Sequence, residues 1–208
     1  GRSGRVNAAP GVRGGGQERA SAQRDRILAA AKQCFIEHGF HAASMASIAE
    51  AADISAGLIY RYFDNKNAII LAIIERQLAE KRADIASLQP GVDFAARIGE
   101  LVARWRVGDE RAMNPTLFLE MSALGKRDPQ IAAALAESDR LTRGDFAAWL
   151  RQRAAGSGQA LSDAEADARA FALQCLVEGL AVRVVREPDI GDAQVAELLA
   201  RILPIVLP

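Results

Sequence analysis

The sequence predicts an all-α protein. Half of its 208 residues are hydrophobic and a quarter are charged, which is ordinary for a globular chain. Alanine is abundant, and apolar residues recur at intervals of three and four along most of the chain, whereas the alternation typical of strands is scarce. Glycine and proline residues separate these periodic stretches. A helical chain of this length can form one large domain or a small domain and a larger one.

Composition also limits the classes of function. The formal net charge is zero, which argues against a general polyanion binder, although a sequence-specific DNA reader needs only a local basic face. No apolar run approaches the roughly 18 residues of a membrane span, and no signal peptide opens the chain, so we expect a cytoplasmic protein without a membrane partner. Cys34 and Cys175 lie in apolar helical contexts, which predicts buried reduced thiols; a redox-sensing role is the alternative.

Residues 1–20 are glycine-rich and basic, and they show no apolar period. Such a composition predicts a disordered arm, and the missing initiator methionine indicates processing or added residues. Arg2, Arg5 and Arg13 could follow DNA phosphates or the minor groove, and a solvated tail is the alternative.

A first helix is expected from about Ser21 to His38, with Gly39 as its left-handed C-cap. Its role is to support the elements that follow. Arg24 and Arg26 near its start are either phosphate contacts or exposed charges. The apolar stripe of this helix consists of Ile27, Leu28, Ala31, Cys34 and Phe35.

Residues 44–63 have the pattern of two short helices joined by a turn. Ser44 is a natural N-cap, and Asp53 and Ile54 interrupt the apolar period before Ser55 caps a second helix that reaches Phe63. In that helix small residues permit close approach to a major groove, and tyrosine and arginine side chains reach phosphates and base edges. The DNA-binding candidates in this stretch are Ser44, Ser55, Ala56, Gly57, Tyr60, Arg61 and Tyr62.

The segment from Arg24 to Ile70 resembles the DNA-binding region of the tetracycline-repressor (TetR) family. The resemblance covers about the first third of the chain, and it implies binding to a double-stranded DNA operator, with Lys66 and the start of its helix on the DNA backbone. Asn67 departs from the family, where an acidic residue is frequent, at a small cost in helix stability. The matching landmarks are Phe35, Gly39, Phe40, Ser44, Ile48, Ala49, Ala52, Ile54, Ser55, Gly57, Ile59, Tyr60, Phe63 and Lys66.

The remaining chain predicts a series of amphipathic helices. We expect the arm to cover residues 1–20, the helix-turn-helix DNA-binding domain residues 21–67, and a ligand-binding and dimerisation domain residues 68–208. The expected helices of this body run from Asn65 to near Gln89, from Val92 to Val107, from Pro115 to Gly125, from Ile131 to about Ala155, from Asp163 to about Arg186, and from Ala193 to Leu203.

The last two helices carry more apolar residues than a thin body needs. Two such helices from each subunit would form a four-helix bundle, as the resemblance also implies, so we expect a homodimer. Closure of the monomer core is the alternative role. The residues in question are Leu176, Leu180, Val184, Val195, Leu198, Leu199 and Ile202, with Ile205 beside them.

The middle helices hold most of the large aromatic side chains. Together with the resemblance, this clustering predicts an apolar pocket for a small-molecule effector, and a fully packed core is the alternative. The candidate ligand-binding residues are Trp105, Phe118, Met121, Phe146 and Trp149.

No catalytic residues, metal ligands or cofactors are expected. Both histidines, His38 and His41, lie in the helix-turn-helix region without cysteine or carboxylate partners at ligand spacing, and no triad or phosphate loop can be assembled. The hypothesis is therefore a dimeric transcriptional regulator and not an enzyme: a repressor released from a palindromic operator by a small, largely apolar effector. A constitutive architectural DNA-binding protein without an effector is the alternative.

Overall fold

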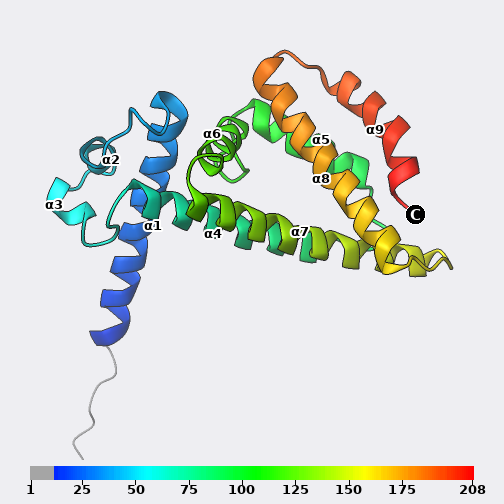
Figure 1. Ribbon diagram of the computed structural model, residues 1–208, viewed down its shortest axis with the longest axis horizontal. Helices are drawn as coiled ribbons and strands as arrows, with labels where there is room; N and C mark the ends of the chain where they lie inside the picture. The colour runs from blue at the N-terminus through cyan, green and yellow to red at the C-terminus, as the bar shows by residue number, and fades with distance from the viewer. Residues whose placement is uncertain (1–11) are drawn as a thin grey trace, which may run out of the picture. The chain divides into compact units, whose positions relative to one another are not determined.

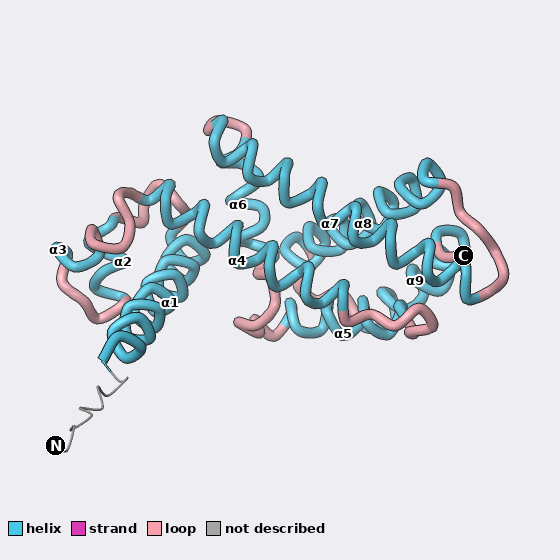
Figure 2. Tube along the Cα trace, turned by 90° about the horizontal axis from the view of Figure 1, so that it is seen from below, coloured by secondary structure: helices cyan, strands magenta, loops and turns pink. Residues whose placement is uncertain are grey.

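The computed structural model describes residues 12–208, and Arg2 and Arg5 of the expected arm lie outside this part. Between residues 12 and 208 the chain forms α-helices and loops without strands (Figures 1 and 2), which confirms the all-α prediction. The helices are α1 (Val12–His38), α2 (Met45–Ala51), α3 (Ala56–Ile59), α4 (Lys66–Ala86), α5 (Phe94–Arg106), α6 (Pro115–Gly125), α7 (Pro129–Gly156), α8 (Asp163–Arg186) and α9 (Asp192–Val206).

The chain divides into two compact units, residues 1–69 and residues 70–208. The expected boundary after residue 67 lies two residues before this division, which falls inside α4. Residues 1–69 contain nine basic and six acidic residues, whereas residues 70–208 contain seventeen basic and twenty acidic residues. A chain of zero net charge therefore consists of a positive unit and a negative unit.

In the first unit, α1 packs against α2, and α2 packs against α3. The apolar stripe that the sequence predicts on α1 is buried in this packing, as are Ile48 of α2 and Ile59 of α3, both fully. Burial of a side chain of this size contributes about 1.5–3 kcal/mol, so the short helices are held by their apolar faces. Burial also raises the pKa of the Cys34 thiol, and the nearby carboxylate of Glu37 adds to the shift.

Helix α1 begins at Val12, nine residues before the predicted start at Ser21. The expected disorder of residues 1–20 is therefore wrong for residues 12–20, although the side chain of Arg13 lies outside the described part. Extending an existing helix adds one hydrogen bond per residue without a new nucleation cost, and residues 17–20 are good helix formers.

The second unit is built around α7 and α8, which pack against each other and against α6. Helix α5 packs against α8 and α9, and α9 runs back along the body after α8 (Figure 1). Its core draws on α5, α7, α8 and α9, and Leu150, Leu173 and Leu199 are among its most buried residues.

Helix α9 continues through Pro204 to Val206 and does not end at Leu203 as predicted. Proline removes one backbone donor, but Leu203 and Val206 are both buried, which favours the added turn. The guanidinium of Arg169 also donates from Nη1 to the carbonyl oxygens of Ile205, at 3.3 Å, and Val206, at 2.7 Å. These contacts satisfy carbonyl groups that a helix end leaves without partners.

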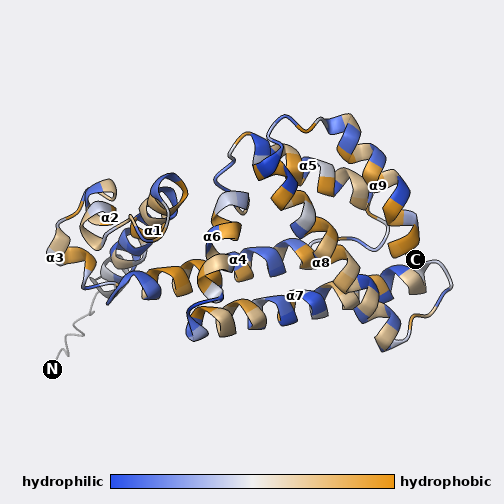
Figure 3. Cartoon of the chain, turned by 45° about the horizontal axis from the view of Figure 1, so that its top comes forward, coloured by the Kyte–Doolittle hydropathy of each residue, from blue (hydrophilic) through white to orange (hydrophobic). Residues whose placement is uncertain are grey.

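Helix α4 changes character along its length. Its first half is hydrophobic and its second half is largely hydrophilic (Figure 3), because five Ile and Leu residues between 69 and 74 give way to charged residues. Among the described residues, no helix combines the length and the apolar character that crossing a bilayer requires.

Candidate functional site

The turn between α2 and α3 is fixed by local hydrogen bonds. The hydroxyl of Ser44 accepts from the backbone N–H of Ser47 at 3.0 Å, and the Ser47 hydroxyl accepts from the Ser44 N–H at 2.9 Å. This reciprocal cap confirms the predicted N-cap at Ser44. Asp53 takes a positive φ of 56° where the chain leaves α2, which is the left-handed conformation that a tight turn needs.

Helix α3 is shorter than predicted. Ser55 caps it by accepting from the Leu58 N–H at 3.1 Å, but the helix ends at Ile59 and does not reach Phe63. The chain continues through tighter turns, in which the N–H of residue 61 donates to the Leu58 carbonyl and that of residue 62 donates to the Ile59 carbonyl, both at 3.0 Å. Bonds to the third preceding residue commonly tighten a helix end.

The predicted DNA-binding side chains lie mostly on the surface of this unit. Ile59 and Phe63 are buried beneath them, so α3 turns its apolar side inward as the sequence predicts. Tyr60 is 55% exposed, which is unusual for so large a side chain in a small unit. The exposed candidates are Ser44, Ser55, Ala56, Gly57, Tyr60 and Arg61, and Tyr62 and Lys66 are half-buried.

Lys66 is held by backbone carbonyls. Its ammonium donates to the carbonyl oxygen of Phe40 at 2.7 Å and to that of His41 at 3.5 Å, and it lies 4.4 Å from the centre of the Phe40 ring. An ammonium has three donors, and these two carbonyls accept from two of them. Lys66 thus joins the start of α4 to the loop that follows α1.

Arg24 and Arg26 also have partners within the chain. The sequence did not decide whether these residues are phosphate contacts or exposed charges. The Nη2 of Arg26 donates to the carbonyl of Ala52 at 2.9 Å, at the C-terminus of α2. The guanidinium of Arg24 lies 5.1 Å from the centre of the Phe63 ring. Both residues therefore connect α1 to the helix-turn-helix, and spacing alone carries no signal for either contact.

The second unit contains a cavity of about 240 Å³. A second cavity of about 150 Å³ lies beside it. Six residues line both cavities and therefore form the boundary between them. These shared residues are Gln77, Lys81, Met113, Phe118, Asp139 and Glu178.

Four of the five predicted effector-binding side chains line one or both cavities. Trp105, Phe118 and Phe146 line the larger cavity, and Phe118 and Met121 line the smaller one. Trp149 lines neither of these two cavities. Its indole N–H donates to the carbonyl of Gln89 at 3.1 Å, and its ring packs 4.9 Å from that of Phe94, so it stabilises the core.

Polar and charged groups meet at the boundary of the two cavities. Burial raises the pKa of the Glu178 carboxyl, and the carboxylate of Asp139 raises it further. Partial desolvation by neighbouring side chains likewise raises the pKa of the Asp139 carboxyl, although Asp139 remains exposed at the surface, and burial lowers the pKa of the Lys81 ammonium. Gln77 is 6% exposed, and its amide nitrogen has no hydrogen-bond partner among residues 12–208.

Four of the predicted dimer residues are buried within the single chain. Leu180, Val184, Val195 and Leu199 are at most 7% exposed, so they pack in the core of the body, which is the alternative role that the sequence left open. The helical period identified the apolar residues but not which of them the body covers. The large apolar or thiol side chains that α8 and α9 leave exposed are Phe171, Cys175, Val185, Leu198 and Ile205, and the predicted Leu176 and Ile202 are partly exposed.

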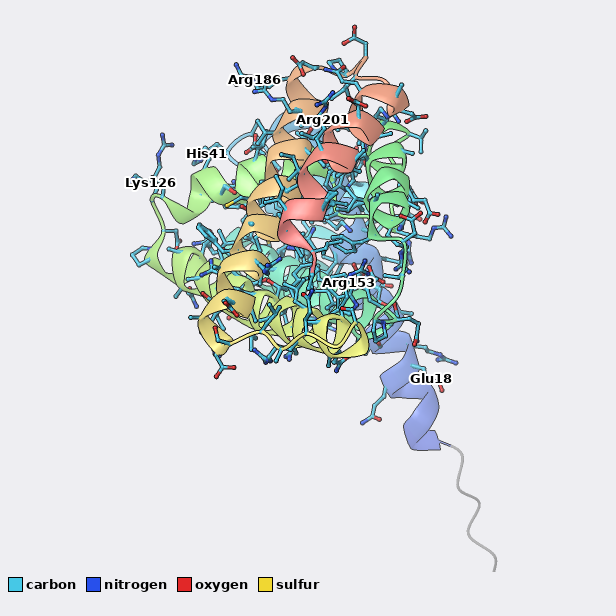
Figure 4. All side chains as sticks on the ribbon, turned by 90° about the vertical axis from the view of Figure 1, so that its right-hand side faces the viewer. Glu18, His41, Lys126, Arg153, Arg186 and Arg201 are labelled. Atoms are coloured by element: carbon cyan, nitrogen blue, oxygen red, sulfur yellow. The ribbon has the colours of Figure 1, made fainter. Side chains whose placement is uncertain are left out.

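This exposed group is called the α8–α9 face below. The expected burial of Cys175 is wrong, because Cys175 belongs to this face, whereas Cys34 is buried as predicted. On α8, Phe171 and Cys175 are four residues apart and therefore lie on one side of the helix. Charged side chains such as Arg186 and Arg201 project from the same two helices (Figure 4).

Comparison with known families supports both units. The profile of the family "Bacterial regulatory proteins, tetR family" matches residues 27–73, and that of the "BetI-type transcriptional repressor, C-terminal" matches residues 95–207. The chain belongs to the TetR family. The resemblance that residues 24–70 carry is therefore confirmed, and this TetR-family protein is a DNA-binding transcriptional regulator.

Individual relatives are similar over most of the chain. The transcriptional regulator UidR of Escherichia coli K12 is 32% identical over 195 residues, which cover 92% of this chain and 96% of UidR. The repressor AcnR of Corynebacterium diphtheriae is 26% identical, covering 89% of this chain and 90% of AcnR. The structure of Salmonella enterica GusR superposes with a TM-score of 0.69 at 27% identity, covering 88% of this chain and 96% of GusR.

Proposed function

We propose that this protein is a homodimeric repressor that binds a palindromic DNA operator and releases it when a small molecule occupies the cavity. The observation that carries the proposal is the combination of an exposed α3 in one unit with a cavity in the other. A single continuous helix, α4, begins in the first unit and supplies cavity walls in the second. A protein of this kind acts where the chromosome lies, in the cytoplasm.

The DNA-reading part of the proposal rests on α3. Ala56 and Gly57 are exposed, and a Cβ added at Gly57 would meet no atom within 4 Å, so this end of the helix is open for close approach. Tyr60 and Arg61 are exposed immediately after it. Tyrosine can donate to phosphate oxygens, and arginine is suited to bidentate contacts with guanine.

The dimer part of the proposal rests on the α8–α9 face. Ile205 is 73% exposed and Phe171 is 52% exposed, although both are large and apolar. Several large apolar side chains exposed on one pair of helices are typical of an interface, and a second copy would cover them with an identical pair of helices. A dimer also presents two α3 helices to two half-sites of a palindrome.

Helix α4 supports the effector part of the proposal. Gln77, Lys81, Asp84 and Ile85 of α4 line the larger cavity, and Lys66 begins the same helix in the DNA-binding unit. A ligand that contacts these residues can favour one conformation of the regulator over another. Coupling of this kind is typically about 1–3 kcal/mol, which corresponds to a 5–150-fold change in DNA affinity.

The test is the sequence specificity of Arg61→Ala on a duplex selected by the wild-type protein from random sequence. We expect a loss of about 1–3 kcal/mol on the selected duplex and a smaller loss on duplexes that are mutated at the contacted base pair. Fluorescence anisotropy titrations at fixed salt measure both affinities.

Arg140→Ala is the matched control, because Arg140 is an exposed arginine of α7 paired with Glu137. Its DNA affinity should equal that of the wild type. The DNA-reading proposal is overturned if Arg61→Ala discriminates between the selected and mutated duplexes as well as the wild type does.

A further inference from the structure

Two groups of polar side chains in the cavity walls differ in their partners. The wall of the larger cavity also includes the charged residues Glu80, Asp84, Arg97, Glu100, Arg104 and Arg111. Thr142 and Gln174 have partners within the chain: the Thr142 hydroxyl donates to the Ser138 carbonyl at 2.9 Å, and the Gln174 amide donates to the Asp139 carbonyl at 2.9 Å. The Nε of Arg143 also donates to the Gln174 side-chain oxygen at 2.8 Å. These groups stabilise the contact of α7 with α8 and need no ligand.

The second group, called the polar cluster below, consists of Gln77, Lys81, Asp139 and Glu178. Among residues 12–208, the Lys81 ammonium forms no hydrogen bond or ion pair with either carboxylate, although the charges are close enough to influence one another. Gln77 is more than nine-tenths buried, and its amide nitrogen lacks an acceptor. Buried donors without partners are costly, so the site is incomplete as it stands.

The mixture of charges determines which chemical group completes this site. A cationic group would meet Lys81, and an anionic group would meet Asp139 and Glu178. The guanidinium of Arg143 acts on both carboxyls as well, so these two carboxyls are influenced by two positive groups, Lys81 and Arg143. A hydroxyl group can donate to a carboxylate and accept from an ammonium or an amide, and it brings no charge.

We propose that the effector is a neutral, hydroxylated molecule, held by hydroxyl groups at the polar cluster and by an apolar portion against Trp105, Phe118 and Phe146. The inference rests on the proposed function, because it specifies the ligand class of the same cavity. It also changes the expected effector from largely apolar to amphiphilic. The indole N–H of Trp105, which has no acceptor among the described residues, supplies a further donor for an oxygen of such a ligand.

The polar cluster includes two residues of α4, the helix that begins in the DNA-binding unit. Gln77 and Lys81 are four residues apart on α4, so they lie on one side of that helix. Asp139 lies on α7, and Glu178 lies on α8. Hydroxyl groups that bridge these three helices hold α4 in one position against the body.

Four probes with the same phenoxypropyl frame test the proposal by isothermal titration calorimetry on the full-length protein. They are 3-phenoxypropane-1,2-diol, phenyl propyl ether, 3-phenoxypropionate and 3-phenoxypropylammonium, which present two hydroxyls, no polar end group, an anion and a cation. We expect the diol to bind about tenfold more tightly than each of the other three, because only it completes the hydrogen bonds without an unpaired charge.

Variants of the polar cluster then test whether the hydroxyl groups of the diol bind there. Glu178→Gln and Lys81→Met should each weaken diol binding about tenfold and leave phenyl propyl ether binding unchanged. Glu178→Gln should also raise the melting temperature of the ligand-free protein, because burial disfavours the ionised carboxyl that it removes. Glu137→Gln is the matched control, since Glu137 is an exposed residue of α7 outside the cavity walls, and it should change neither affinity.

Each outcome decides between the ligand classes. Tightest binding of the anion, the cation or the ether overturns the hydroxylated class while leaving the cavity as an effector site. Equal loss of diol and ether affinity in Glu178→Gln assigns the cluster a structural role and overturns the inference, as does binding of none of the probes. The DNA-binding comparison of Arg61→Ala uses no ligand, so its failure is separate from these.

Discussion

The helix-turn-helix unit and the helical body differ in the range of the contacts that define them. In the first unit, Ser44, Ser55 and Asn65 each accept a hydrogen bond from the N–H three residues later. At the cavity of the body, the contact between Arg143 and Gln174 joins residues 31 positions apart. The starts of these short helices are therefore determined by short stretches of sequence, although Arg26 with Ala52 and Lys66 with Phe40 add contacts between residues 26 positions apart. The cavity depends on the packing of several helices.

The two units also differ in charge. Residues 1–69 have an excess of three positive charges and residues 70–208 an excess of three negative charges, from nine against six and seventeen against twenty. A positive unit attracts the DNA backbone, and a negative body opposes non-specific attachment of the rest of the chain. The net charge of the whole chain conceals this division, which appears only when the units are counted separately.

The largest expected effect concerns neighbouring leucines of α9 in the body. Leu199 is 1% exposed and Leu198 is 37% exposed. Leu199→Glu should destabilise the protein by at least about 3 kcal/mol, because it removes a buried side chain and buries a carboxylate without a partner. Leu198→Glu should leave the fold intact and convert dimers to monomers, because it places a charge on the α8–α9 face.

Urea unfolding followed by circular dichroism measures the first effect, and light scattering after gel filtration measures the second. Val107→Glu is the control, since Val107 is 80% exposed and lies outside α8 and α9, so this variant should stay dimeric. A Leu198→Glu variant that is as dimeric as the wild type would refute the assignment of the interface. A monomeric wild type at micromolar concentration would refute the dimer itself.

A smaller effect is expected at Lys66 in the helix-turn-helix unit. Lys66→Met removes the hydrogen bond to the Phe40 carbonyl and the contact with the Phe40 ring, which should cost about 1 kcal/mol of stability. It should also flatten the dependence of log K on log salt by about one unit, through loss of one phosphate contact. Arg61→Ala, by contrast, should leave the free energy of unfolding unchanged, because the Arg61 side chain forms no hydrogen bond or ion pair with the described residues.

Urea titrations and anisotropy at several salt concentrations separate these two roles. A Lys66→Met variant of unchanged stability would show that the carbonyl contacts contribute nothing to the fold. A variant with lower stability and an unchanged salt slope would assign Lys66 to the fold alone.

Much of the fold could be predicted because its signals are local. The start of α2 after Ser44 and the span of α8 from Asp163 to Arg186 are as predicted, and each rests on a capping residue and a helical apolar period. The capping box of Ser162 and Glu165 is likewise formed, with the Ser162 N–H donating to the Glu165 carboxylate at 2.9 Å. Such signals involve residues that the helix itself brings together.

The rest depends on contacts between distant segments. Lys81, Asp139 and Glu178 are isolated charges in the sequence, and only the packing of α4, α7 and α8 places them at one cavity. The helical period could not tell Leu198 from Leu199, because which of two adjacent apolar residues is covered depends on the neighbouring helix. Lys66 and Arg26 donate to backbone carbonyls. Such contacts cannot be predicted from residue types, because every residue has a backbone carbonyl.

The smallest expected effect concerns the first turns of α1, which depend on local helix propensity alone. Gly14, Gly15 and Gly16 lie within the helix, and a Cβ at any of them would meet no atom within 4 Å. Replacing all three with alanine removes unfavourable backbone entropy without creating contacts, so each should favour the local helix by about 0.5–1 kcal/mol. Exposed terminal turns open independently of the core, so global stability should change by less than about 0.5 kcal/mol.

Hydrogen exchange of the full-length triple variant separates the local effect from the global one. Amides of residues 17–26 should exchange more slowly than in the wild type, while the buried turns around Ile27 and Phe35 should keep their rates. Gly57→Ala, which also has open space around its Cβ, is the control and should not affect α1. Unchanged protection of residues 17–26 would contradict the local account and show that contacts beyond helix propensity already hold these turns.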